Sequence, residues 1–306
     1  MAATTKHKPL SPLELITPEI IPQIKGIASP YQLYRFDKSD DRYYFMYDQD
    51  GGAEGFLSVT SFCGKSLGKG DILVDWMVKM GKEEAEGFAR MRADYGTLLH
   101  IECVEILRNG KGDFTAIGER AFAHAIELGY KHIALTWMED IVKDIAAFMQ
   151  FCKDYEVEVI FAEFPIASRT WKLGGCIDLG LLMKFGKGKE KIKAIVDIKS
   201  GRKGFFEGHE LQLHTYKKIW NEHFGELWPV THVFNWSPTN WRKTPTYKLK
   251  NQTKSKFAES VESRMKTGLI EGWCKPPLGY FELVGEFTVE GFDFEEHVRF
   301  NKISRK

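Results

Sequence analysis

The sequence predicts an α/β protein in which a central mixed β-sheet is flanked by helices, with β-rich additions at the N- and C-terminal ends. Three observations predict this class. Apolar residues recur at helical spacing over much of residues 58–155, then alternate with polar ones between 157 and 199, and return to helical spacing after 207. Helices and strands that follow one another in this way usually form one sheet with helices packed on it.

The N-terminal part starts with strands and continues with helices. Two aromatic runs within residues 31–58, followed by a glycine-containing turn, predict a β-hairpin. The helical pattern that follows begins at the capping residue Ser58 and ends at Asn109, before Gly110. A second helical region covers residues 118–155.

The later part contains the predicted sheet. Strands are predicted at residues 157–167, 174–183 and 192–199, a helix at 208–224, and further strands in "THVFNW" and "TPTYKLK". No Pro/Ser-rich linker divides the chain convincingly. We therefore expect an N-terminal extension (1–60), a core (61–250), and a C-terminal helix and strands packed on the core (251–306).

Composition excludes several classes of protein. The 306 residues carry a formal net charge of +1, so any contact with nucleic acid must be local. The basic run Lys184–Lys203 offers such a contact, although its "KFGKGKEK" portion also reads as a solvated hairpin loop. The 5 cysteines are scattered without a Cys-x-x-Cys pair, which predicts reduced thiols in a cytoplasm. No apolar run suggests a signal peptide or a membrane span.

Acidic side chains interrupt three apolar strands. Asp197 and Lys199, two residues apart in "IKAIVDIKSG", project from the same strand face. Asp178 lies within "GGCIDLGLLM" and Glu163 within "VIFAEFPIA", where an isolated carboxylate is costly to bury. A lone strand-end aspartate is often a turn or cap residue. Three acids on neighbouring strands, however, are most simply compensated by a divalent cation.

At this point the sequence resembles the PD-(D/E)XK nuclease superfamily, in particular its RecB-like exonuclease branch. The resemblance runs from about residue 95 to 216, through "GTLLH", "GGCIDLG", "DIKSG" and "QLHTY" in the order of that branch. The motifs place functional residues at His100, Asp178, Asp197, Lys199, Gln212 and Tyr216, with Glu163 where members often carry an acid. Ile177 replaces the proline that names the superfamily, and the four clustered cysteines of iron–sulfur members are missing.

The resemblance implies a restriction-endonuclease-like nuclease core and a metal site without an iron–sulfur cluster. Its metal ligands would be His100, Asp178, Asp197, Glu163 and the backbone carbonyl of Ile198. Mg²⁺ suits the oxygen ligands, and the histidine nitrogen predicts that Mn²⁺ substitutes well. Lys199 would orient the attacking water or stabilise developing charge. Gln212 and Tyr216, four residues apart on one helix face, would contact the phosphate backbone or support the ligands.

The expected function is therefore a divalent-metal-dependent deoxyribonuclease, most simply an exonuclease that acts on DNA ends in replication, recombination or repair. Two alternatives stay open: an endonuclease of the same superfamily, and a non-catalytic nucleic-acid-binding or assembly protein on this fold. The expected partners are DNA ends or single strands and a replication or recombination protein, without a membrane. The expected location is the cytoplasm, or the host cytoplasm if a phage encodes the protein.

One further region admits two interpretations. In "NWSPTNWRKTPTY", the aromatic residues Trp236, Trp241 and Tyr247 flank two basic ones. Such a mixture suits stacking on unpaired bases. It suits the packed interior of a hairpin equally well.

Overall fold

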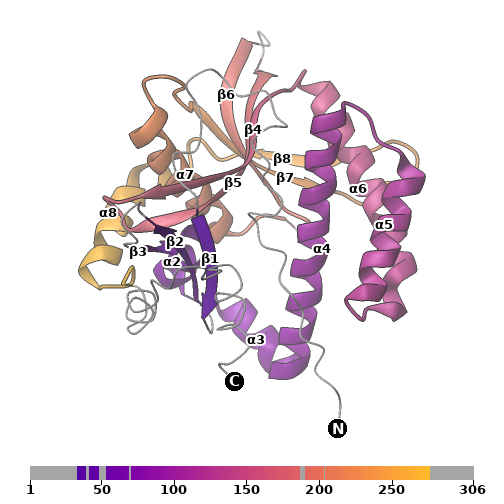
Figure 1. Ribbon diagram of the computed structural model, residues 1–306, viewed down its shortest axis with the longest axis horizontal. Coiled ribbons are helices and arrows are strands. Elements are labelled where there is room, and N and C mark those ends of the chain that lie inside the picture. The colour runs from indigo at the N-terminus through magenta and orange to yellow at the C-terminus, as the bar shows by residue number, and fades with distance from the viewer. Residues whose placement is uncertain are drawn as a thin grey trace, which may run out of the picture.

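A computed structural model describes residues 33–38, 41–47, 53–68, 70–186, 190–202 and 204–275. Figure 1 shows a β-sheet with helices on both sides, which confirms the predicted α/β class. The sheet has 8 strands and is mixed, because β3 with β5 and β6 with β7 are parallel while the other pairs are antiparallel.

The elements follow the predicted order. The strands are β1 (Leu33–Lys38), β2 (Asp41–Tyr47), β3 (Ala53–Ser58), β4 (Glu158–Ser168), β5 (Leu173–Phe185), β6 (Glu190–Ile198), β7 (His232–Pro238) and β8 (Tyr247–Asn251). The α-helices are α2 (Val59–Leu67), α3 (Asp71–Met80), α4 (Lys82–Asn109), α5 (Phe114–Glu127), α6 (Ala134–Asp154), α7 (Glu207–Phe224) and α8 (Phe257–Ile270), with a short 3-10 helix at Lys131–Ile133.

The helical stretch from 58 to 109 is divided by glycines. Ser58 caps α2 as predicted, because its hydroxyl accepts a hydrogen bond from the Ser61 N–H at 2.9 Å. Gly68 and Gly81 follow the ends of α2 and α3 with φ of 70° and 86°. These left-handed conformations favour glycine and stop each helix. The single predicted helical region is therefore three helices, and only α4 carries the predicted histidine.

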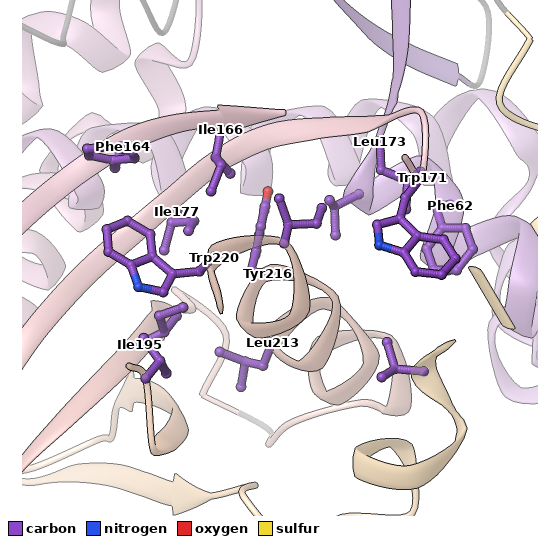
Figure 2. Close-up of a cluster of buried hydrophobic side chains, with 14 of the residues drawn as sticks. Phe62, Phe164, Ile166, Trp171, Leu173, Ile177, Ile195, Leu213, Tyr216 and Trp220 are labelled. Carbon is purple, nitrogen blue, oxygen red and sulfur yellow. The ribbon is translucent and has the colours of Figure 1, made fainter. Parts of the chain in front are cut away.

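Two hydrophobic clusters lie on opposite faces of the sheet. On one face, β4, β6 and β7 contribute side chains that pack against α2, α7 and α8. Figure 2 shows part of this cluster, with Trp220 and Leu213 of α7 below Ile166 and Ile177 of the strands. On the other face, Val196 and Ile198 of β6 pack with α4, α5 and α6. Adjacent residues of β6 thus face different helices, as the alternating pattern predicted.

The sheet forks along β5. On one edge, β4 pairs with β5 from Leu173 to Leu182. On the opposite edge, β3 pairs only with Leu173 and Gly174, and β6 pairs from Leu179 to Phe185. Within the described part of the chain, residues 175–178 have no strand partner on that edge. Asp178 is one of the residues in this gap.

The aromatic residues after β6 mostly serve packing. Trp236 is 0% exposed and lies edge-on to Phe148, with ring centroids 5.3 Å apart. The Tyr247 hydroxyl donates to Asp154 at 2.7 Å, and the Trp241 indole donates to the Lys143 carbonyl at 3.2 Å. Hairpin packing thus accounts for Trp236, which cannot stack on a base from the interior.

Several predicted features lie outside the described residues. They are the strands expected after residue 275, the first 32 residues of the N-terminal extension, and residues 187–189 of the basic loop. Either side of that loop, Lys184 pairs with Glu156 at 2.6 Å and Lys191 pairs with Glu158. Among the described residues, no helix combines the length and apolar character needed to cross a bilayer.

Candidate metal centre

His100, Glu163 and Asp178 come together at the fork of the sheet. Each offers one ligand atom, and these atoms all lie within 4.8 Å of one another. His100 reaches the group from α4: its Nδ1 is 3.0 Å from Glu163 Oε1 and its Nε2 is 3.1 Å from the Ile198 carbonyl oxygen. Three residues from distant parts of the sequence thus form a compact nitrogen and oxygen donor set.

The local sequence explains how α4 approaches so closely. Gly96 lies one turn before His100, and a Cβ atom at Gly96 would be 3.3 Å from the Ser200 hydroxyl. The Arg92 guanidinium also donates to the Ser200 carbonyl at 3.2 Å. The small residue and the arginine therefore hold α4 against the segment that follows β6.

Glu163 has an unusual backbone. Its φ is 45°, in the left-handed region that residues with a Cβ seldom adopt, although it lies within β4. Such conformations cost roughly 1–3 kcal/mol and cluster at functional sites. The conformation is associated with a carboxylate that also accepts from the Cys176 thiol at 3.5 Å.

Asp178 and His100 have linked electrostatics. Burial raises the pKa of Asp178, while the His100 charge opposes that rise. Burial alone would lower the pKa of His100, but Asp178 and Glu163 outweigh it and raise that pKa to about 9. The imidazolium is therefore the positive charge that faces these two carboxylates. Asp178 Oδ2 also accepts from the Ile198 N–H at 2.7 Å, which fixes it against the end of β6.

Asp197 and Lys199 form a second part of the site. The Lys199 ammonium donates to Asp197 Oδ1 at 2.8 Å and to Gln212 Oε1 of α7 at 3.3 Å. The Asp197 side chain is only 4% exposed, so it lies in the interior although it stands next to the last residue of β6. Burial lowers the pKa of Lys199, but Asp197 and Asp178 raise it above its usual value. The lysine therefore remains charged.

The predicted metal ligands do not all lie in one group. His100, Glu163 and Asp178 do, and the Ile198 carbonyl contacts His100. Asp197 lies outside the three-residue group, because its carboxylate is engaged by Lys199 and Asn235. Burial raises the pKa of Asp197, Lys199 opposes that rise, and the Asp178 charge adds to it, so the two aspartates still influence each other electrostatically.

Tyr216 lies in the core beside the site. It is 4% exposed, and Figure 2 shows it rising from α7 toward the strands. A Cβ atom at Gly175 would be 2.4 Å from its hydroxyl oxygen, so Gly175 makes room for this tyrosine. Gly175 pairs with Ile166 of β4 and, within the described residues, has no strand partner on its other side. The contact with Tyr216 explains the glycine directly before "CID".

Sequence reasoning missed Asn235 and His209. Asn235 interrupts the apolar run "HVFNW" in the same way that Asp178 interrupts its own strand, so the same signal would have found it. His209 precedes Gln212 by three residues on the same face of α7. Burial and the nearby Lys199 lower the pKa of His209 to about 4, so its ring is neutral.

The segment after Lys199 is anchored from three elements. The Arg202 guanidinium donates to Asp144 Oδ1 of α6 at 2.5 Å, and the Tyr95 hydroxyl of α4 donates to Asp144 Oδ2 at 2.7 Å. The Lys248 ammonium of β8 donates to the Arg202 carbonyl at 3.2 Å. Asp144 is 0% exposed, so this anchor is internal to the fold.

Comparisons with known proteins identify no family. No protein-family model matches the chain, and a search of curated proteins finds no relative. The geometry of the site and the motifs of the sequence therefore carry the functional argument.

Proposed function

We propose that the protein is a divalent-metal-dependent nuclease of the PD-(D/E)XK type that hydrolyses phosphodiester bonds of DNA, most simply as an exonuclease acting on ends. The observation that carries the proposal is the meeting of His100, Glu163 and Asp178 at the fork. Beside them lies a charged lysine, Lys199, held by a buried aspartate. Nucleases of this type use these residue types together.

The residues fit a divalent cation. They would supply two carboxylates, a backbone carbonyl and one imidazole nitrogen, the last once a bound cation displaces a proton from the His100 imidazolium. These are hard or borderline donors suited to Mg²⁺ and especially to Mn²⁺. Their side chains are only 11–24% exposed, so a bound ion would be partly dehydrated. Such an ion would supply a water of lowered pKa and positive charge at the scissile phosphate.

The chain's own residues would then position the substrate. The Lys199 ammonium, kept charged by Asp197, would donate to a phosphate oxygen or hold the attacking water. Gln212 contacts the same ammonium and would fix its direction. Tyr216 is buried in the core, so we assign it a supporting role and leave DNA contact to more exposed groups.

The decisive experiment uses end-labelled linear DNA and covalently closed circular DNA in Mg²⁺, Mn²⁺ or EDTA. Asp178→Asn and Lys199→Ala should each reduce the rate of linear DNA loss by about 100-fold or more. The control variants lie on β4, which pairs with the strand of Asp178, and on β6, which ends directly before Lys199. Glu158→Gln of β4 and Lys191→Ala of β6 remove an exposed ion pair and should cleave like the wild type.

Each outcome decides between the alternatives. Loss of linear DNA alone supports an exonuclease, whereas cutting of the circle indicates an endonuclease. A folded wild-type protein that binds DNA and cleaves neither substrate in either metal would contradict the proposal and favour the non-catalytic binding protein.

A further inference from the structure

Asn235 of β7 is a fully buried polar residue that contacts Asp197. Its side chain is enclosed, with 0% of the residue exposed, and its Nδ2 donates to Asp197 Oδ2 at 2.7 Å. Asn235 and Asp197 are direct partners in the parallel pairing of β7 with β6. The contact is therefore set by the register of the sheet.

The two oxygens of Asp197 are held by different donors. Lys199 donates to Oδ1 at 2.8 Å, and Asn235 donates to Oδ2 at 2.7 Å. A carboxylate held at both oxygens cannot rotate without breaking one of these bonds. Charge-assisted bonds of this kind are stronger than neutral ones.

Asn235 is itself oriented by a second buried amide. Gln252, 3% exposed, donates from Nε2 to Asn235 Oδ1 at 3.3 Å. The Gln252 backbone carbonyl in turn lies 2.9 Å from His214 Nε2 of α7. This arrangement turns the NH₂ group of Asn235 toward Asp197, because a flipped amide would set two acceptors against each other.

We propose that Asn235 is a positioning residue that fixes the Asp197 carboxylate, and through it Lys199, for hydrolysis. The inference rests on the proposed nuclease function. Asn235 is enclosed and does not reach DNA, so it acts only through Asp197. Partners that orient catalytic and metal-binding groups typically contribute 10- to 100-fold to activity or metal affinity.

The test compares Asn235→Asp and Asn235→Ser with the control Ser237→Ala. Ser237 lies two residues along β7 and is also 0% exposed, and its hydroxyl has no hydrogen-bond partner among the residues that the structure describes. We expect kcat to fall about 10- to 100-fold in Asn235→Asp and less in Asn235→Ser. KM for DNA should stay within about twofold of the wild type, because the residue does not contact substrate. Ser237→Ala should retain the wild-type kcat.

Thermal unfolding and Mn²⁺ titration separate positioning from folding. Each variant is assayed well below its own unfolding midpoint, and Mn²⁺ binding is followed by calorimetry. If Asn235→Asp does not fold, Gln252→Leu, which frees the Asn235 amide to flip, should give a smaller loss of kcat in the same direction.

The outcomes distinguish this inference from the proposed function. A folded wild type that neither binds Mn²⁺ nor cleaves DNA would overturn the proposed function and the inference with it. A wild type that cleaves, with folded Asn235 variants that match Ser237→Ala in kcat, would overturn the inference alone. A fall in unfolding midpoint with unchanged kcat would likewise assign Asn235 a purely structural role.

Discussion

Glu163 adopts a backbone conformation that favours glycine, and its carboxylate lies beside His100 and Asp178. The sequence "FAEFP" does not predict a positive φ at Glu163, because its pattern is that of an ordinary strand. The site therefore contains local strain that only the folded chain reveals. If the strain serves the carboxylate, relieving it should increase stability while activity is lost.

The positive φ of Glu163 predicts the relative stability of two variants. Glu163→Gly and Glu163→Ala both remove the carboxylate, but glycine adopts a φ of 45° without strain. We expect Glu163→Gly to have a free energy of unfolding about 1 kcal/mol higher than Glu163→Ala. Urea denaturation measures the difference, and an alanine variant of equal or greater stability would contradict it. Both variants should lose nuclease activity.

Gly175 leaves the space that the Tyr216 side chain occupies. A Cβ atom there would meet the Tyr216 hydroxyl at 2.4 Å and its ring carbons at 3.0 and 3.1 Å. We expect Gly175→Ala to lower the free energy of unfolding by roughly 1–3 kcal/mol through overpacking. Tyr216→Phe removes the hydroxyl oxygen, which is the atom closest to the added Cβ. In a Tyr216→Phe protein, Gly175→Ala should therefore lower the free energy of unfolding by less.

A double-mutant cycle on unfolding free energies measures this coupling. Gly87→Ala is the control, since a Cβ atom at Gly87 of α4 would meet nothing within 4 Å. That substitution should be neutral or mildly stabilising, as expected for a helix interior. If Gly175→Ala lowered the free energy of unfolding equally in the wild type and in Tyr216→Phe, the proposed contact would be refuted.

At the scale of elements, the sequence predicted the strands and the helix that carry the motifs. The alternation around Asp197 placed Val196 and Ile198 on one face, and the structure has them there. The helical spacing of apolar residues over 208–224 likewise predicted α7. Patterns of period 2 and 3.6 are local, so they can be read from neighbouring residues.

Contacts between elements were harder to predict. The link between Asp197 and Asn235 joins strands that lie side by side only because β7 returns parallel to β6. The bridge from Arg202 to Asp144 joins residues 58 positions apart. Such contacts depend on topology, which no single window of sequence contains.

That bridge between α6 and the segment after β6 predicts a pH dependence. Burial raises the pKa of Asp144 from 3.8 to about 6, against the opposing influence of Arg202. Between these values the folded protein binds more protons than the unfolded chain, so this group makes the unfolding free energy fall as pH rises. Across the whole interval, Asp144 changes the free energy of unfolding by about 3 kcal/mol.

Asp144→Asn should remove that part of the pH profile. The stability of the wild type relative to this variant should therefore be greater at pH 4 than at pH 7. Urea denaturation across this range measures it, with Glu139→Gln, an exposed site on α6, as control. A constant difference between wild type and Asp144→Asn would show that Asp144 has an ordinary pKa.

At the scale of the whole molecule, ligand binding and folding are linked. An ion that binds only the folded protein stabilises it by about 2.7 kcal/mol at 100 times its dissociation constant. For a chain of 306 residues we expect Mn²⁺ to raise the unfolding midpoint by roughly 4 °C, reversibly with EDTA. Differential scanning calorimetry measures the shift.

The same shift tests the position of the site. Glu158→Gln should retain it, and Asp178→Asn should lose most of it. An equal shift in Asp178→Asn would place the ion elsewhere on the molecule, even if the wild type proved to be a nuclease.

Among the described residues the sheet ends at β8, and this edge affects how one copy of the protein meets another. An open strand edge invites pairing with a strand of another molecule, which leads to aggregation. In β8, the exposed Lys248 and Lys250 alternate with half-buried Tyr247 and Leu249. Their ammonium groups are engaged by the Arg202 carbonyl and by Glu210 at 2.9 Å. A strand arriving from another copy would meet these two charged side chains, so within the described part of the chain this edge is a poor template for intermolecular sheet pairing.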